Sequence, residues 1–242
     1  MNNSYRLFRI FGINIKIHAT FMLLPLFLGF LYYRDYGWEV GLRAFTLVLL
    51  VFVFVLAHEL SHSLRAKKYG IRVPEITLYP IGGVASMQRI PRQPWQEFTI
   101  SIVGPLSNFL IALVLYYPLY IILGRENLFS PSLETWPRTF ANLFWINPVL
   151  GIFNLIPAFP MDGGRILRSI LARRMNYLKA TRISVYIGHI FAILFVLLGI
   201  WTKHWMLILI ALFIYLAASN EEKMVLYEEI LRQNNERKDA SN

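Results

Sequence analysis

The stretch VFVFVLAHELSHSLRAKK, residues 51–68, decides the fold. Seven residues without a polar side chain lead directly into His58, Glu59 and His62, and three basic residues follow at once. Ionisable side chains are expensive inside a lipid-spanning helix, and where they occur they usually carry a function. The stretch therefore predicts a membrane helix that ends in a functional site.

Apolar residues are gathered in long blocks along the rest of the chain. Of its 242 residues, 56% are hydrophobic and 16% are charged, whereas a soluble domain has about 45–50% apolar and about 25% charged residues. A helix needs about 20 mostly apolar residues to cross the hydrocarbon layer. We predict an all-α polytopic membrane protein with six transmembrane helices, at roughly 17–33, 44–64, 98–123, 140–159, 183–201 and 205–219.

The two ends of the chain differ in character. The first apolar block is followed by YYRDYG, residues 32–37, and not by a small-residue cleavage site, so it is interpreted as a retained span. Residues 1–220 are predicted to form the six-span membrane core, and residues 221–242 a cytoplasmic amphipathic helix with a polar tail.

Basic residues alternate in number between the predicted loops. Of the 24 Lys and Arg residues, 19 lie in the N-terminal tail, the second loop, the fourth loop and the C-terminal tail. The positive-inside rule then places both termini in the cytoplasm, with HELSH near the cytoplasmic end of the second span. The net charge of +10 is explained by this topology and needs no nucleic-acid partner.

HELSH matches the pattern HExxH, whose spacing suits metal binding when the segment is helical. Residues four apart project from one face, so His58 and His62 can offer ring nitrogens to one metal ion, and Glu59 beside them can take a proton from water. A catalytic zinc site usually has three protein ligands. Because the chain has no cysteine, the third ligand must be a histidine or a carboxylate.

Five side chains are the candidates for that third ligand. His18 opens the first span and His204 lies in an outer loop, so neither is well placed. His189 lies within the fifth span, where an interhelical hydrogen bond is the alternative role. Glu97 begins the third span and Asp162 follows the fourth.

Asp162 stands in the segment FNLIPAFPMDGGRI, residues 153–166. Its two prolines interrupt the helix, and the glycine pair after Asp162 permits a tight turn. Irregular backbone at membrane depth is tolerated only inside protein or beside a watery cavity. Asp162 is therefore a candidate third ligand, and the alternative is a helix-capping aspartate in an ordinary loop.

Three motifs together resemble the site-2 protease family of intramembrane zinc metalloproteases: HELSH at 58–62, GPLSN at 104–108 and NLIPAFPMDGG at 154–164. The chain is most similar to the six-span branch that includes the sporulation pro-sigma-factor processing enzymes. By that resemblance His58, His62 and Asp162 bind one Zn²⁺ and Glu59 is the catalytic base. Many members of that branch carry a nucleotide-sensing CBS domain after the last span, and another branch carries a PDZ domain; this sequence predicts neither.

The resemblance implies a zinc-dependent intramembrane endopeptidase. Its substrates would be membrane-anchored proteins, cut in or near their transmembrane segments, in a bacterial or archaeal cell membrane. Asn154 is the candidate amide for stabilising the developing oxyanion, and Asn108 is a second. For both, the alternative is a hydrogen bond between helices. Gly104 and Pro105 are interpreted as packing and kink residues.

The segment EITLYPIGGVASMQ, residues 75–88, has two β-favouring runs around a Pro-Ile-Gly-Gly break. That pattern predicts a small β-hairpin on the cytoplasmic side, close to the zinc helix. Its unpaired edge could accept an extended substrate through main-chain hydrogen bonds. The alternative is a plain connecting hairpin.

Three other functions share parts of the pattern. A secondary transporter would place ionisable groups near the membrane midplane, but it would normally show an internal repeat, which this sequence lacks. A non-catalytic metal-binding protein would have no need of Glu59. A membrane zinc hydrolase of non-peptide substrates would use the same residues, and only the family resemblance favours peptides. The sequence predicts no particular inhibitory partner or oligomeric state.

Overall fold

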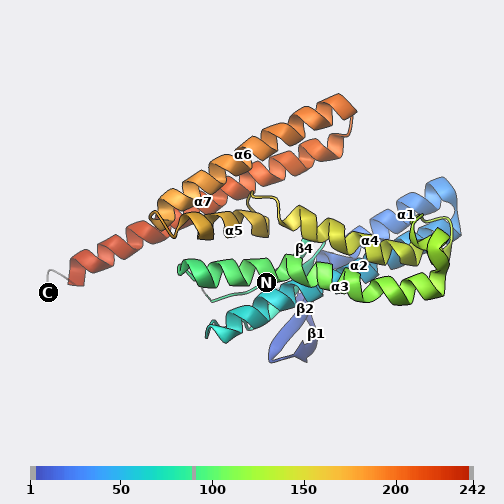
Figure 1. The fold of residues 1–242 in the computed structure, drawn as a ribbon, viewed down its shortest axis with the longest axis horizontal. Coiled ribbons are helices and arrows are strands. Elements are labelled where there is room, and N and C mark those ends of the chain that lie inside the picture. Colours follow the sequence, from blue (N-terminus) through green and yellow to red (C-terminus); the bar gives the residue numbers. More distant parts are fainter. Residues whose placement is uncertain (1–3, 89–90, 240–242) are drawn as a thin grey trace. The chain divides into compact units, whose positions relative to one another are not determined.

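The computed structural model describes residues 4–88 and 91–239, and it is mostly helical (Figure 1). The chain divides into two compact units. The first consists of residues 1–90 and 103–152, and the second of residues 91–102 and 153–242.

Four α-helices and one short 3₁₀ helix of the described residues belong mainly to the first unit. A short 3₁₀ helix at Ala19–Met22 leads into α1, Leu23–Tyr36, which packs beside α2, Trp38–Lys68 (Figure 1). Most of α3, Pro94–Leu128, and most of α4, Trp136–Asn154, follow. Phe21, Phe52 and Leu78 form a buried apolar cluster that joins the 3₁₀ helix, α2 and the sheet.

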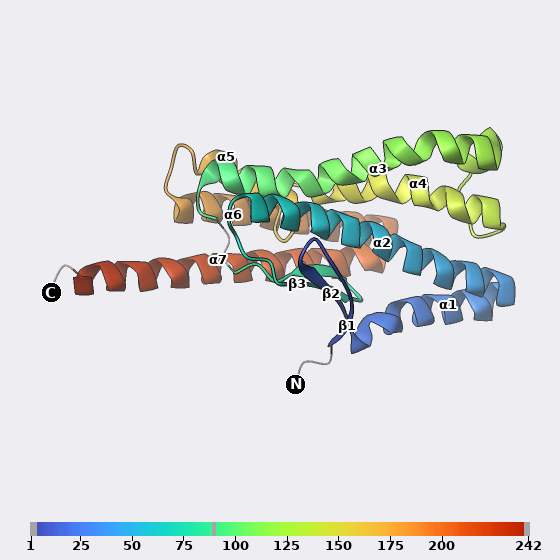
Figure 2. The ribbon, with the colours of Figure 1, turned by 90° about the horizontal axis from the view of Figure 1, so that it is seen from below.

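A four-stranded sheet completes the first unit and packs against α2 (Figure 2). Strands β1, Ser4–Ile10, and β2, Ile13–His18, are antiparallel. Strand β2 then pairs in parallel with β3, Glu75–Tyr79, which pairs antiparallel with β4, Gly82–Ala85. The order β1-β2-β3-β4 leaves β4 at one edge.

The second unit is built around a long helical pair. Helices α6, Tyr177–Thr202, and α7, Trp205–Asp239, lie side by side (Figure 1). The shorter α5, Asp162–Leu171, packs against α6. One apolar cluster in this unit consists of Ala158, Met161, Ala192, Ala211 and Ile214, and a second consists of Phe159, Val185 and Ala218.

Four helices of the described chain are long and apolar enough to cross a membrane. They are α2, α3, α6 and the part of α7 from Trp205 to Asn235. The predicted first span instead divides between β2, the 3₁₀ helix and α1, which has only 14 residues. The predicted fourth span corresponds to α4, which has 19 residues and contains Pro148. The structure therefore confirms a membrane-type helical fold but not all six spans.

The sheet is larger than the sequence predicted. The hairpin expected at residues 75–88 is present as β3 and β4, but β1 and β2 were missed, so the description as all-α is too simple. The parallel pairing of β2 with β3 joins residues about 60 positions apart, such as Ile15 and Ile76, and local sequence does not reveal it. Helix α7 continues past residue 220 without a break, so the division at that point stays a prediction; residues 240–242 of the predicted tail lie outside the described residues.

Candidate metal centre

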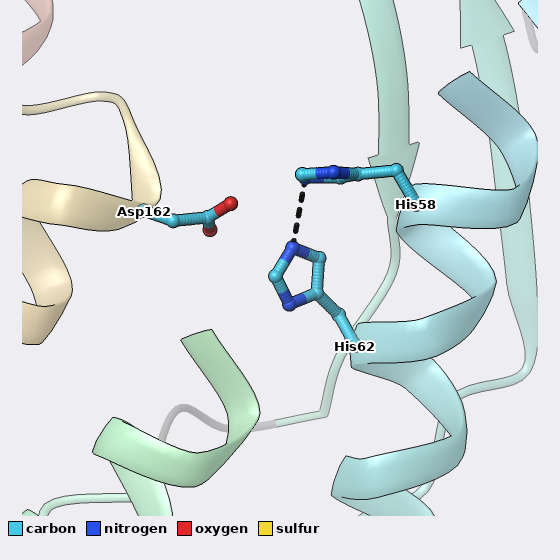
Figure 3. Close-up of side chains that lie close together, drawn as sticks. All are labelled: His58, His62 and Asp162. Carbon is cyan, nitrogen blue, oxygen red and sulfur yellow. Dashed lines mark hydrogen bonds between the residues drawn. The ribbon is translucent and has the colours of Figure 1, made fainter. Parts of the chain in front are cut away.

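His58 and His62 lie one turn apart on α2, and both are buried. The apolar run before them makes this part of α2 a regular helix, so the two rings project from the same face. Their Nε2 atoms face each other at 3.0 Å (Figure 3). Two imidazole nitrogens bound to one zinc at about 2.0–2.1 Å in tetrahedral geometry lie about 3.3 Å apart. The histidine pair therefore fits a shared metal ion after a shift of a few tenths of an ångström.

Asn108 orients the first of these rings. It comes from the GPLSN motif on α3, is fully buried, and its Oδ1 lies 3.3 Å from His58 Nδ1. A carbonyl oxygen can only accept, so the His58 ring carries its hydrogen on Nδ1 and directs the Nε2 lone pair toward His62. Metal-binding histidines commonly have such a partner, because it fixes the tautomer and the ring orientation.

Gly104 lies against the faces of both rings. A Cβ at this position would be 2.2 Å from His62 Nε2 and 2.8 Å from His58 Cε1. Any side chain here would occupy the space in front of the ring atoms His62 Nε2 and His58 Cε1. Gly104 is a packing residue, as the sequence suggested, but what it packs against is the histidine pair itself.

Glu59 follows His58 on α2 and is close to strand β4. A Cβ at Gly83 would be 2.6 Å from Glu59 Cγ, so the glycine leaves room for the carboxylate beside the strand. This closeness brings the predicted catalytic base next to the edge strand of the sheet, as the sequence predicted when it placed a hairpin close to the zinc helix.

The free edge of β4 has two main-chain donors that point away from β3. Ser86 N donates to Glu75 O at 2.9 Å, and the register pairs Val84 with Thr77. Because antiparallel pairs alternate, the N–H groups of Val84 and Ser86 face β3, whereas those of Gly83 and Ala85 face outward.

Asp162 is the first residue of α5, in the second unit (Figure 3). A Cβ at the next residue, Gly163, would lie 2.2 Å from Ile156 O, and one at Gly164 would lie 2.7 Å from Phe159 N. The glycine pair therefore lets α5 begin directly against the preceding loop, which fixes where the Asp162 backbone lies. The role of Asp162 as the third ligand stays a prediction from the motif.

The other candidate ligands have different partners. His189 Nε2 lies 3.2 Å from Ser219 Oγ, which confirms the expected bond between α6 and α7. His18 Nδ1 accepts from Thr20 N at the start of the 3₁₀ helix, and the exposed His204 contacts Thr202 O. Glu97 is bound by the guanidinium of Arg168.

Of the two candidate amides, Asn108 forms the expected hydrogen bond between helices, with His58 as its partner. Asn154 is the last residue of α4 and is half-buried. Its predicted role toward an oxyanion stays a prediction. Sequence reasoning noted Asn108 but missed its partner, because the contact joins residues 50 positions apart.

Comparisons with known proteins agree with the motif pattern. A model described as peptidase family M50 matches residues 45–130 and 127–195. The chain is 43% identical over 234 residues to "Zinc metalloprotease MJ0392" of Methanocaldococcus jannaschii, which covers 96% of this chain and 64% of that protein. It is 27% identical over 176 residues to "Stage IV sporulation protein FB" of Bacillus subtilis, over 71% of this chain and 56% of that one.

One solved structure is also similar. The "Site-2 Protease from Methanocaldococcus jannaschii" has a TM-score of 0.63 and 42% sequence identity, and the match covers 90% of this chain and 95% of that chain. The resemblance inferred from the motifs is therefore confirmed. The chain spans less than two thirds of the length of the two curated relatives.

Proposed function

We propose, because this chain belongs to peptidase family M50, that it is a zinc-dependent endopeptidase acting within the membrane. The observation that carries the proposal is the facing pair of Nε2 atoms on α2, with Asn108 orienting His58. Family membership favours this function over a transporter or a hydrolase of non-peptide substrates. His58, His62 and Asp162 would hold one Zn²⁺, which when bound supplies Lewis acidity and lowers the pKa of water to about 7.

Glu59 is the general base of this proposal. It takes a proton from the attacking water and delivers it to the leaving amine as the peptide bond breaks. The space that Gly83 leaves beside Glu59 Cγ supports this role. A carboxylate that must move a proton between water and substrate needs to lie beside the place where the substrate binds.

Asp162 is the proposed third ligand. Its carboxylate is a hard oxygen donor of the kind that completes two-histidine zinc sites. The family motif resembled by residues 154–164 assigns it that role, and its position as the first residue of α5 anchors its backbone. In the same motif, Asn154 is proposed to donate from its side-chain amide to the oxyanion of the tetrahedral intermediate.

Strand β4 is the proposed binding site for the substrate backbone. A transmembrane substrate must be extended before it is cut, because a helix hides its carbonyl groups in its own hydrogen bonds. The outward N–H groups of Gly83 and Ala85 can pair with such an extended segment. Main-chain pairing does not depend on particular substrate side chains.

The proposed topology has six spans, with α1 and α4 completing the set, and both termini in the cytoplasm. The distribution of basic residues supports it. Reporter fusions after Tyr69 and after Met175 should then report the cytoplasm, and a fusion after Ser130 should report the outside. A signal from outside at Tyr69 would reverse the map and move the site to the other leaflet.

The function is tested by incubating the purified full chain with single-span membrane proteins in detergent or liposomes. We expect discrete cleavage within or near the span, loss of cleavage with a zinc chelator, and recovery when zinc is restored. Cleavage that persists unchanged after complete zinc removal would contradict the proposal. So would hydrolysis of small esters by a zinc-loaded protein that cuts none of the membrane substrates.

A further inference from the structure

A buried ion cluster lies in the second unit, apart from the proposed ligands. The Arg168 guanidinium is fully buried and joins two carboxylates from different helices. Its Nε donates to Glu97 Oε1 at 2.8 Å, in the first turn of α3, and its Nη1 donates to Glu221 Oε1 at 2.7 Å, on α7. The side chains of Glu97 and Glu221 are 2% and 11% exposed.

Two aromatic rings enclose the same guanidinium. Its Cζ lies 4.9 Å from the centre of the Phe159 ring and 4.8 Å from that of Tyr177. Phe159 is buried and belongs to the loop that leads into α5, and Tyr177 begins α6. Arg168 thus contacts four segments of the second unit through one side chain.

These contacts surround the helix that Asp162 begins. Asp162 and Arg168 are six residues apart on α5, or about 9 Å along the axis. Arg168 therefore holds the helix through Glu97 and Glu221, and it holds the loop before the helix through Phe159. The start of α5 is restrained from both sides of Asp162.

Such a cluster is not needed for stability alone. Taking three charged groups out of water is expensive, and well-packed apolar side chains of similar volume often stabilise a fold as well or better. What a guanidinium supplies in addition is direction, because the N–H donors of its planar fork reach acceptors only in a narrow range of positions. Burial lowers the pKa of Arg168, but the Glu97 carboxylate and its other neighbours raise it by more, so the fork stays charged.

We propose that Arg168 is a positioning residue for the metal centre: by fixing α5 against α3 and α7, it holds the Asp162 carboxylate in place for zinc. The inference rests on the proposed ligand role of Asp162. It extends the centre to a cluster whose residues are not among the proposed ligands.

The test replaces Arg168 and Glu97 together. Arg168→Met alone would leave Glu97 as an unpaired buried charge and could unfold the protein. The double variant Arg168→Met/Glu97→Gln removes the fork without leaving the more deeply buried of its two carboxylates unpaired. Its matched control is Arg182→Met/Glu222→Gln, which removes an exposed pair between α6 and α7 with an N–O distance of 3.2 Å.

Zinc affinity is measured by chelator competition on purified protein in detergent, together with the visible spectrum of the Co²⁺-substituted form. We expect the Arg168 double variant to bind zinc about 10- to 100-fold more weakly, the usual effect of losing a group that orients a ligand. Its Co²⁺ spectrum should shift toward that of Asp162→Ala. The Arg182 double variant should match the wild type in both measurements, and all variants should keep the helical circular dichroism of the wild type.

The decisive comparison combines the Arg168 double variant with Asp162→Ala. If Arg168 acts through Asp162, the combined variant binds zinc no more weakly than Asp162→Ala alone. If the losses of zinc affinity are additive, the positioning role is overturned. It is also overturned if the Arg168 double variant keeps the wild-type zinc affinity while Asp162→Ala binds zinc more weakly. Wild-type affinity in Asp162→Ala itself would instead overturn the ligand assignment on which the inference rests.

Discussion

Replacing Gly104 by alanine should weaken zinc binding, although Gly104 is not a ligand. The added methyl group would lie 2.2 Å from His62 Nε2 and 2.4 Å from His62 Cε1. Ordinary contact is about 3.4 Å, so the His62 ring must move by about 1.2 Å, whereas metal–ligand distances vary by only about 0.2 Å. The methyl group and a zinc-binding His62 cannot both keep their positions.

The size of the effect follows from the cost of overpacking. Forcing an extra methyl group into a well-packed region costs about 1–3 kcal/mol. If that cost falls on the zinc-bound state, the affinity drops by about 5- to 140-fold, at 1.4 kcal/mol for each factor of about ten. Gly188→Ala is the matched control, because its Cβ would lie at an ordinary 3.5 Å from Ala158 Cβ on another part of the chain.

Chelator competition on both purified variants measures the effect, and circular dichroism checks that each remains folded. We expect a weakened zinc affinity for Gly104→Ala and an unchanged one for Gly188→Ala. A folded Gly104→Ala variant with wild-type zinc affinity would show that the rings do not bind metal in the arrangement described here.

Two further predictions concern groups around the centre. Asn108→Ala removes the acceptor that fixes the tautomer of His58, so zinc affinity should fall by about 10- to 100-fold in the same assay; an unchanged affinity would mean that the ring needs no such partner. Ala85→Pro removes an outward donor of β4, and it should abolish cleavage at normal zinc content because an edge strand tolerates proline only where no partner binds. Val84→Ala, which trims an exposed side chain of the same strand, should cleave normally, and cleavage by Ala85→Pro at the wild-type rate would remove β4 from the substrate site.

Local sequence was enough for the features that depend on near neighbours. The four-residue spacing of His58 and His62 predicts that their rings share a helix face, and the structure has them facing each other on α2. The Pro-Ile-Gly-Gly break predicts the turn between β3 and β4. The position of His189 within an apolar block predicts its bond to a neighbouring helix.

Features that depend on distant partners were missed. INIKIH, residues 13–18, alternates between apolar and polar residues as a strand does. The apolar pattern does not reveal the strand before it as a hairpin partner. Its pairing with β3 is parallel and joins distant parts of the chain. Glu97 was a candidate ligand because it is an acid beside an apolar block. Its actual partner, Arg168, lies 71 residues away, and nothing in either local sequence indicates the pair.

Glu59→Gln tests the central claim most directly, because it removes the base and leaves the size of the side chain and the ligands unchanged. Zinc content is measured by elemental analysis after dialysis, and cleavage of a single-span substrate is measured on the same preparation. The proposed function predicts about one zinc per chain, as in the wild type, and no detectable cleavage. Turnover near the wild-type rate at full zinc content would contradict the role of Glu59 and with it the proposed reaction.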